Sequence, residues 1–437
     1  MVDLADVTST IASGARALDA ARARLQIAAV CMVGLALGAS ILPFCAVGAA
    51  LGPMMLELGW GANNVSLAYA LLMWAGALSV WPMGVLIDRY GPRPVVALGA
   101  VAMAAVSLML PMVRHFWQFC ALAGLLGACG SSGLGYLRVV ASLFGPRRGL
   151  AMGVFAAESS ILSLVMPIVL GRLVTDAGWR GAFTAIGVGL LALAPLLYMG
   201  LADPRPGASW TSRWSLPRPV SAEGLTAREV VKDWVFWLIV AAALATAAIG
   251  GGALTSFGAA IATKGFGQAT VFRAAPITMI ATLAGAICSG VMLDRTRSPK
   301  VAAAAYLATA VTYLLWALVT PSFGGAPMLT AGLAIGAFAY AAQIPLVGYF
   351  FTRYFGLKCF ATVCGLQAFV QAVAVGFGGP LIAHSVGLIG DYNLLFEAGI
   401  GAQILAALLY LVLPAYRYAA LADSSSDPAP APRVRAR

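Results

Sequence analysis

Charged residues are scarce in this chain of 437 residues, and histidine is scarcer still. Only 10% of the residues are charged, whereas 61% are apolar and the mean hydropathy is +0.91. A water-facing surface does not tolerate that balance, which excludes a soluble globular protein. The two histidines, His115 and His384, and seven cysteines without a C-x-x-C pair offer no metal or disulfide pattern. Nucleotide-binding motifs are also lacking, so we expect no cofactor, no metal and no enzymatic activity.

The sequence contains many long apolar runs. A membrane-spanning helix needs ~20 mostly apolar residues, and lipid offers the backbone no hydrogen-bond partner, so such runs must be helical. We therefore predict an all-α integral membrane protein with twelve transmembrane helices. The predicted spans lie near residues 26–50, 65–87, 94–113, 117–144, 148–171, 181–201, 234–262, 272–293, 301–319, 327–351, 360–383 and 394–416.

The net charge of +11 is distributed unevenly over the predicted loops. Most of the Lys and Arg residues fall in the two tails and in the loops on the same side of the membrane. The opposite loops hold only Arg114, Arg172, Arg180, Lys264 and Arg273. The positive-inside rule then predicts cytoplasmic N- and C-termini and a multi-pass protein of the plasma membrane, the inner membrane of a bacterium. Because this charge orients the protein in lipid, we expect no nucleic-acid partner.

A short phrase occurs twice. The sequence GVLIDRYGPR at residues 84–93 returns as GVMLDR at 290–295, which is 206 residues later (84 to 290), and both copies end an apolar run. A second internal repeat pairs Phe144-Gly145-Pro146-Arg147 with Phe355-Gly356-Leu357-Lys358, which lies 211 residues later (144 to 355). Two anchors at similar offsets predict two copies of one six-helix unit, the organisation of a secondary transporter.

Composition divides the chain into five segments. We expect a cytoplasmic tail at 1–25, a six-helix bundle at 26–201, a Pro- and Arg-containing cytoplasmic linker at 202–232, a second six-helix bundle at 233–418 and a disordered cytoplasmic tail at 419–437. The linker's polar composition suits a connection that lets two bundles move relative to each other.

Several motifs carry a family resemblance. The phrase G-x-L-x-D-R-x-G-x-R at 84–93 resembles the signature of the major facilitator superfamily. FGPRRGLAMG at 144–153, GWRGAF at 178–183 and RYFGLKCFATVCGLQAF at 353–369 resemble bacterial relatives of the monocarboxylate and oxalate-formate transporters in that superfamily. The resemblance implies the major facilitator fold, with two pseudo-symmetric bundles, and transport of a small molecule. Carboxylate transporters of this group place a basic residue deep in the eighth or eleventh span, but here Arg273 and Lys358 lie near span ends.

The repeated phrase supplies the candidate gating residues, which are Gly84, Asp88, Arg89, Gly91, Arg93, Asp294 and Arg295. Asp88 can pair with a basic residue or a helix end of the neighbouring bundle and hold the cytoplasmic side shut. Gly84 and Gly91 permit close helix approach and a tight turn. Alternatively, the arginines only orient the loop and Asp88 caps a helix. Since the second copy lacks the glycine of the turn, we expect Asp88 to matter more than Asp294.

Two charged residues fall inside predicted spans. Arg138 in the fourth span and Glu158 in the fifth are each ten residues from Arg148. At 1.5 Å per residue both would lie ~15 Å from the turn between these helices, near the midplane of the membrane. We therefore expect a direct or substrate-bridged pair in which Arg138 attracts an anion and Glu158 takes up a proton. The alternative is a structural ion pair that never meets substrate.

Uncharged polar residues extend the candidate site. Tyr136 in the fourth span, and Tyr340 and Gln343 in the tenth, belong to helices that border the pathway in the superfamily that this chain resembles. Hydrogen bonding between helices is at least as common a role for such residues.

The predicted function is secondary active transport of a small organic anion, such as a monocarboxylate, by alternating access and proton symport. The alternative is a carrier or exporter of a neutral or amphiphilic small molecule, with Arg138 and Glu158 as a structural pair. The expected partners are the substrate, protons and the lipid bilayer, and we expect a monomer.

Overall fold

The computed structural model is helical throughout its described part. It describes residues 22, 25–37, 41–144, 147–201, 224–296, 298–389, 391–414, 416 and 417. Nearly all of the predicted tail 1–25, most of the predicted linker 202–232 and the predicted tail 419–437 lie outside these residues. Within them no strand is formed, and two isolated bridges join Gly224 to Gly356 and Thr320 to Gly324.

The described part of the first half contains six spans in nine helical segments. The first span combines residues 25–37 with α2 (Leu42–Leu58). There follow α3 (Ala62–Tyr90), α4 (Pro92–Met109) with η1 (Leu110–Met112), α5 (Phe116–Gly130), η2 (Ser131–Gly133), α6 (Leu134–Leu143) and α7 (Arg148–Gly200). Helix α7 has 53 residues and holds two spans, because Gly178 breaks it with φ 69° and ψ 165°. A positive φ of this kind favours glycine.

The second half repeats this order. It contains α9 (Ala227–Lys232), α10 (Trp234–Thr263), α11 (Gln268–Arg273), α12 (Ala275–Thr296), α13 (Lys300–Leu318), α14 (Gly325–Phe355), α15 (Phe360–Ile389) and α16 (Asn393–Leu411). Of the described segments, 11 are long and apolar enough to cross a membrane, and dividing α7 at Gly178 makes twelve. The predicted all-α, twelve-helix fold class is confirmed.

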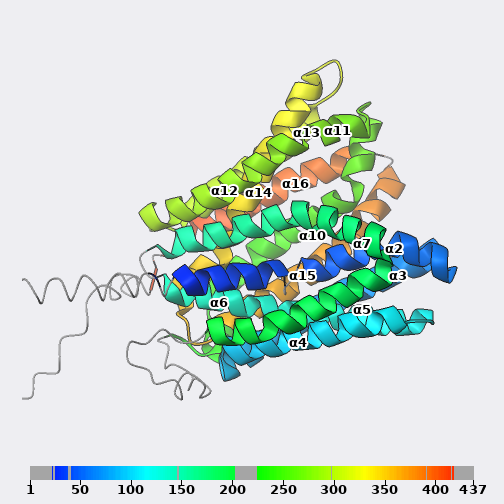
Figure 1. Ribbon diagram of the computed structural model, residues 1–437. Coiled ribbons are helices and arrows are strands. Elements are labelled where there is room, and N and C mark those ends of the chain that lie inside the picture. Colours follow the sequence, from blue (N-terminus) through cyan, green and yellow to red (C-terminus); the bar gives the residue numbers. More distant parts are fainter. Residues whose placement is uncertain are drawn as a thin grey trace, which may run out of the picture.

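The helices run side by side, with α4 and α5 on one flank, α12, α13 and α14 on the other, and α7, α10 and α15 between them (Figure 1). Helices of the first half contact one another through α3–α5, α4–α7 and α2–α7, and those of the second half through α10–α15, α12–α14 and α13–α16. The halves meet mainly along two seams, α3–α15 and α7–α12. Each seam pairs one helix from each half, as a pseudo-symmetric dimer of bundles requires.

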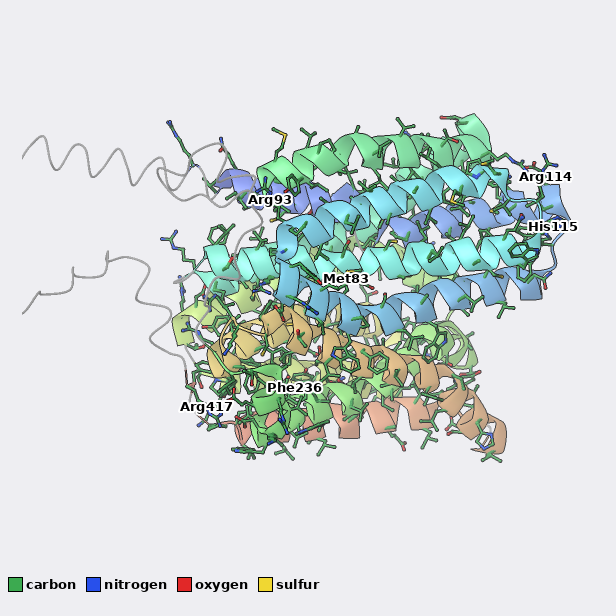
Figure 2. The ribbon with its side chains drawn as sticks, turned by 90° about the horizontal axis from the view of Figure 1, so that it is seen from below. Met83, Arg93, Arg114, His115, Phe236 and Arg417 are labelled. Carbon is green, nitrogen blue, oxygen red and sulfur yellow. The ribbon has the colours of Figure 1, made fainter. Side chains whose placement is uncertain are left out.

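The two ends of the molecule differ in the residues they carry. Figure 2 shows Arg93 and Arg417 at one end and Arg114 and His115 at the other. We call the first the signature end, because the repeated phrase lies there, and the second the opposite end.

Aromatic packing stabilises the second half at the signature end. Phe236, Tyr349, Phe350, Tyr354 and Tyr410 are fully buried in one apolar cluster from α10, α14 and α16. Burying each such side chain contributes about 1.5–3 kcal/mol. The first half has its own cluster near the opposite end, built from α2 to α7. The signature-end cluster also includes Ala141 of α6 and Met152 of α7, so it joins the second half to the first.

Candidate functional site

Asp88 joins the two bundles at the signature end. It lies at the last turn of α3, and its carboxylate accepts hydrogen bonds from the backbone N–H of Thr362 (2.6 Å), the Thr362 hydroxyl (2.6 Å) and the backbone N–H of Ala361 (3.3 Å). These donors form the first turn of α15. Because a helix N-terminus carries a partial positive charge, a buried carboxylate there is stabilised. Asp88 thus contacts a helix end of the other bundle, the partner expected for it.

Arg138 completes this contact from α6. Its guanidinium forms an ion pair with Asp88 and donates to the carbonyl of Ile87 at 3.2 Å. The side chains of Arg138 and Asp88 are 16% and 11% exposed, so the pair is largely shielded from solvent. We call the group Asp88, Arg138 and Thr362 the first cap.

The direct pair predicted between Arg138 and Glu158 is not formed, because Arg138 binds Asp88 instead, whereas a substrate-bridged arrangement stays a prediction. Helix α6 ends at Leu143, five residues after Arg138, so this residue lies only ~8 Å from the helix end. Glu158 lies ten residues into α7, which is ~15 Å along its axis. The long arginine side chain then reaches the carboxylate at the signature end, and not the midplane.

Asp294 makes the equivalent contact in the second half. Its two carboxylate oxygens accept hydrogen bonds from the backbone N–H groups of Gly149 (2.7 Å) and Leu150 (2.8 Å), in the first turn of α7. Tyr349 donates to the carbonyl of Leu293 at 3.0 Å, as Arg138 does to Ile87. We call Asp294 and the amides it binds the second cap. The two caps follow the internal repeat.

Glycines allow both seams to close. A Cβ on Gly149 would lie 2.5 Å from the carbonyl oxygen of Gly290 and 2.7 Å from Asp294 Oδ1. A Cβ on Gly365 would lie 2.7 Å from the carbonyl oxygen of Val80 on the other seam. Gly84, like Gly290, faces the backbone of the opposite bundle with no room for a side chain. Backbone contact this close requires small residues.

The remaining residues of the signature phrase lie within the first bundle or at the surface. Gly91 has φ 88°, so the turn between α3 and α4 requires glycine. Arg93 is buried, stacks on the ring of Tyr198 (4.1 Å) and donates to its carbonyl oxygen. Arg89 and Arg295 are exposed. Arg93 therefore links α4 to α7 within the first bundle.

Glu158 is a buried carboxylate in the fifth span. It is 8% exposed, and its Oε2 atom has no hydrogen-bond partner among the described residues. Cys31 of the first span lies within electrostatic range of Glu158 and also of Tyr136. Tyr136 is 1% exposed, and its phenol packs against Gly34. The structure therefore brings the predicted residues Glu158 and Tyr136 to the same region of the first bundle.

Tyr340 and Gln343 lie on α14 of the second bundle. Gln343 donates to the Thr309 hydroxyl of α13 at 2.7 Å, and Tyr340 is 65% exposed. Gly336, on the same face of α14, packs against Thr312 of α13. Gln343 therefore binds the neighbouring helix α13 of its own bundle, and the contact of Tyr340 and Gln343 with substrate stays a prediction.

GWRGAF, the motif at 178–183, organises the opposite end of the first bundle. After the break at Gly178, Trp179 and Arg180 both bind the carboxylate of Glu57 at the end of α2. Arg180 also donates to the carbonyl of Pro111 at 3.1 Å. The motif thus ties the fifth and sixth spans to the first and third spans, which is a structural role.

Sequence reasoning missed the donors of both caps. Thr362 and Leu150 are 212 residues apart (150 to 362), as are Gly153 and Gly365, which lie on the two seams. The sequence signal for these residues is their offset of 212 residues, which is close to the 206 residues between Asp88 and Asp294 and so indicates equivalent positions in the two halves. Over the described residues, no group of three or more His, Cys, Asp and Glu side chains could hold a metal ion.

Comparison with known proteins agrees with this architecture. The family described as Major Facilitator Superfamily matches residues 28–380. The solved structure of the proton:xylose symporter XylE superposes with a TM-score of 0.70 over 90% of this chain and 96% of that one, at 13% identity, and so shares the fold.

Curated relatives are more distant in sequence. The "Probable L-galactonate transporter" of Escherichia coli is 32% identical over 151 residues, 33% of this chain and 32% of that protein. "Monocarboxylate transporter 11" of Mus musculus is 27% identical over 350 residues, 76% of this chain and 75% of that protein. The first curated matches span between 25% and 35% of the relatives' lengths. The family resemblance is nonetheless confirmed, and the chain belongs to the major facilitator superfamily.

Proposed function

We propose that the protein is a proton-coupled secondary transporter of a small organic anion and that it works by alternating access. Membership of the superfamily supports transport of a small molecule across a membrane. The names of two relatives, an L-galactonate transporter and a monocarboxylate transporter, support an organic acid as cargo.

The proposed proton coupling depends on the buried carboxylate of Glu158. A carboxylate buried in a membrane span is costly when ionised and unpaired, so such residues usually serve a transport pathway. Its Oε2 atom has no partner among the described residues, which leaves the group available to bind a proton or a substrate hydroxyl. Glu158 would gain a proton in one state of the cycle and release it in the other.

The two caps serve as the gate of this cycle. With the signature end in the cytoplasm, as the positive-inside rule predicts, Asp88 and Asp294 hold the cytoplasmic ends of the bundles together. Opening toward the cytoplasm would break both sets of carboxylate hydrogen bonds. Both caps lie on the two seams between the bundles, which suits rigid-body motion of one bundle against the other.

A neutral or amphiphilic cargo is the second candidate. It is favoured by the ion pair of Arg138 with Asp88, which removes the cation that was expected to hold an anionic substrate near Glu158. In this variant Glu158 still exchanges a proton, while the cargo is recognised by hydrogen bonds and apolar contacts.

Transport assays in proteoliposomes separate the two candidates. Uptake of labelled lactate, pyruvate, oxalate and aromatic acids would be measured with and without an inward proton gradient. The proposal expects one of these acids to accumulate only with the gradient. If no carboxylate is taken up or competes at any pH, the anion is excluded and the neutral cargo is favoured.

A further inference from the structure

A second group of buried charges lies at the signature end, beside the second cap. Arg148, the first residue of α7, is 4% exposed, and Arg353 of α14 is 3% exposed. Arg353 donates to the Tyr349 hydroxyl at 2.9 Å and lies over the rings of Tyr349 (5.1 Å) and Tyr416 (5.9 Å). Arg148 lies within electrostatic range of Arg353, Tyr349 and Asp294.

Arg148 differs from Arg138 in its counter-ion. Arg138 forms a direct ion pair with Asp88 in the first cap. The corresponding carboxylate of the second cap, Asp294, uses its two oxygens to accept the amides of Gly149 and Leu150. No salt bridge or hydrogen bond of Arg148 is recorded with any other described residue, and its Nε atom is buried without a partner.

A buried guanidinium without a bonded counter-ion is expensive. Removing a charge from water costs several kcal/mol unless an opposite charge and hydrogen bonds replace the solvent. The ring of Tyr416 packs against Tyr349 with centroids 6.1 Å apart, and its hydroxyl is also buried without a partner in the described part of the chain. The local surroundings thus combine positive charge with unused hydrogen-bond donors.

We propose that a small inorganic anion such as chloride binds beside Arg148, between the two bundles. The anion would accept a hydrogen bond from Arg148 Nε and would balance the charge that Asp294 offsets only at a distance. A water molecule could satisfy the hydrogen bond but not the charge. Because Arg148 belongs to the first bundle and Arg353 to the second, the bound anion would favour the state in which the signature end is closed.

Anion-dependent thermal stability tests this site. The purified full-length protein would be unfolded while sodium chloride replaces sodium methanesulfonate at constant ionic strength. Because the ligand binds the folded state only, the expected result is a rise in Tm of roughly 1–2 °C at tenfold excess over Kd, which continues to increase with the logarithm of the chloride concentration. Bromide would replace chloride. Arg148→Gln would abolish the rise, whereas Arg228→Gln, at an exposed arginine of α9, would retain it.

Two results would overturn the proposal. One is a wild-type Tm that does not rise with the concentration of chloride or bromide. The other is a dependence that survives unchanged in Arg148→Gln. Should that variant not fold, Arg148→Lys keeps the charge but loses the Nε donor, and the chloride concentration needed for a given rise in Tm should then increase several-fold. An unchanged value would also count against the site. The inference does not depend on which substrate the protein carries.

Discussion

Replacing Gly149 with alanine should open the signature end. The new Cβ would lie 2.5 Å from the carbonyl oxygen of Gly290, whereas relaxed carbon-to-oxygen contacts are about 3.3–3.6 Å. The seam must therefore widen by roughly 1 Å locally, and overpacking of this kind costs about 1–3 kcal/mol. Since the contact joins two bundles, the cost applies to the closed state and should shift the closed-to-open ratio by about 5–150-fold.

Electron-electron double resonance can measure this shift. Nitroxides at Ser142 and Thr296, exposed residues at the signature ends of α6 and α12, would report the separation of the bundles in a cysteine-free background. Gly149→Ala should move the distance distribution to longer values.

Gly189→Ala is the matched control, because Gly189 lies in the same helix α7 and a Cβ there meets nothing within 4 Å. That change should leave the distances unchanged and can raise helix stability by up to about 1 kcal/mol. Equal distributions for Gly149→Ala and the wild type, or an equal shift in the control, would refute the reasoning.

Two further predictions concern the first cap. Asp88→Asn leaves Arg138 buried and unpaired and should lower the free energy of unfolding by about 3–5 kcal/mol. The double variant with Arg138→Gln should lose less than the sum of the two single losses, and additive losses in this double-mutant cycle would contradict the ion pair. Burial, with Asp88 nearby, raises the pKa of the Cys359 thiol to about 12. At pH 7.5 the thiolate fraction of Cys359 should be on the order of 10³-fold lower than that of an ordinary thiol, and its rate of labelling by maleimide should be lower to the same extent. The labelling rate should increase with pH up to 12. Fast labelling of Cys359 would refute its burial.

The spans and the repeat could be predicted because they depend on properties that sequence displays directly. Twenty apolar residues must form a helix in lipid, and an Asp-Arg pair recurring at the end of such a run marks a duplicated boundary. The partner type of Asp88 was also predictable, since a carboxylate at a helix junction has few options other than a cation or a helix N-terminus.

The partner of Arg138 could not be predicted by counting residues. The count measured the depth of both residues from Arg148, but α6 already ends at Leu143, so Arg138 lies closer to its helix end than Glu158 does. An arginine side chain also extends several ångströms from its helix, so equal depth of Cα atoms does not imply contact. The orientation of Gln343 toward α13 escaped prediction for a related reason, because the hydrophobic pattern of an all-apolar helix hardly distinguishes its faces.

The central claim is tested most directly by comparing proton-driven accumulation of substrate with substrate exchange in the Glu158→Gln variant. Glutamine keeps the size and polarity of the side chain but cannot carry a proton. Once a transported acid is known, the variant should still exchange labelled for unlabelled substrate across the vesicle membrane, while losing accumulation driven by an inward proton gradient. A Glu158→Gln protein that accumulates substrate as the wild type does would contradict the assignment of Glu158 as the proton-coupling residue.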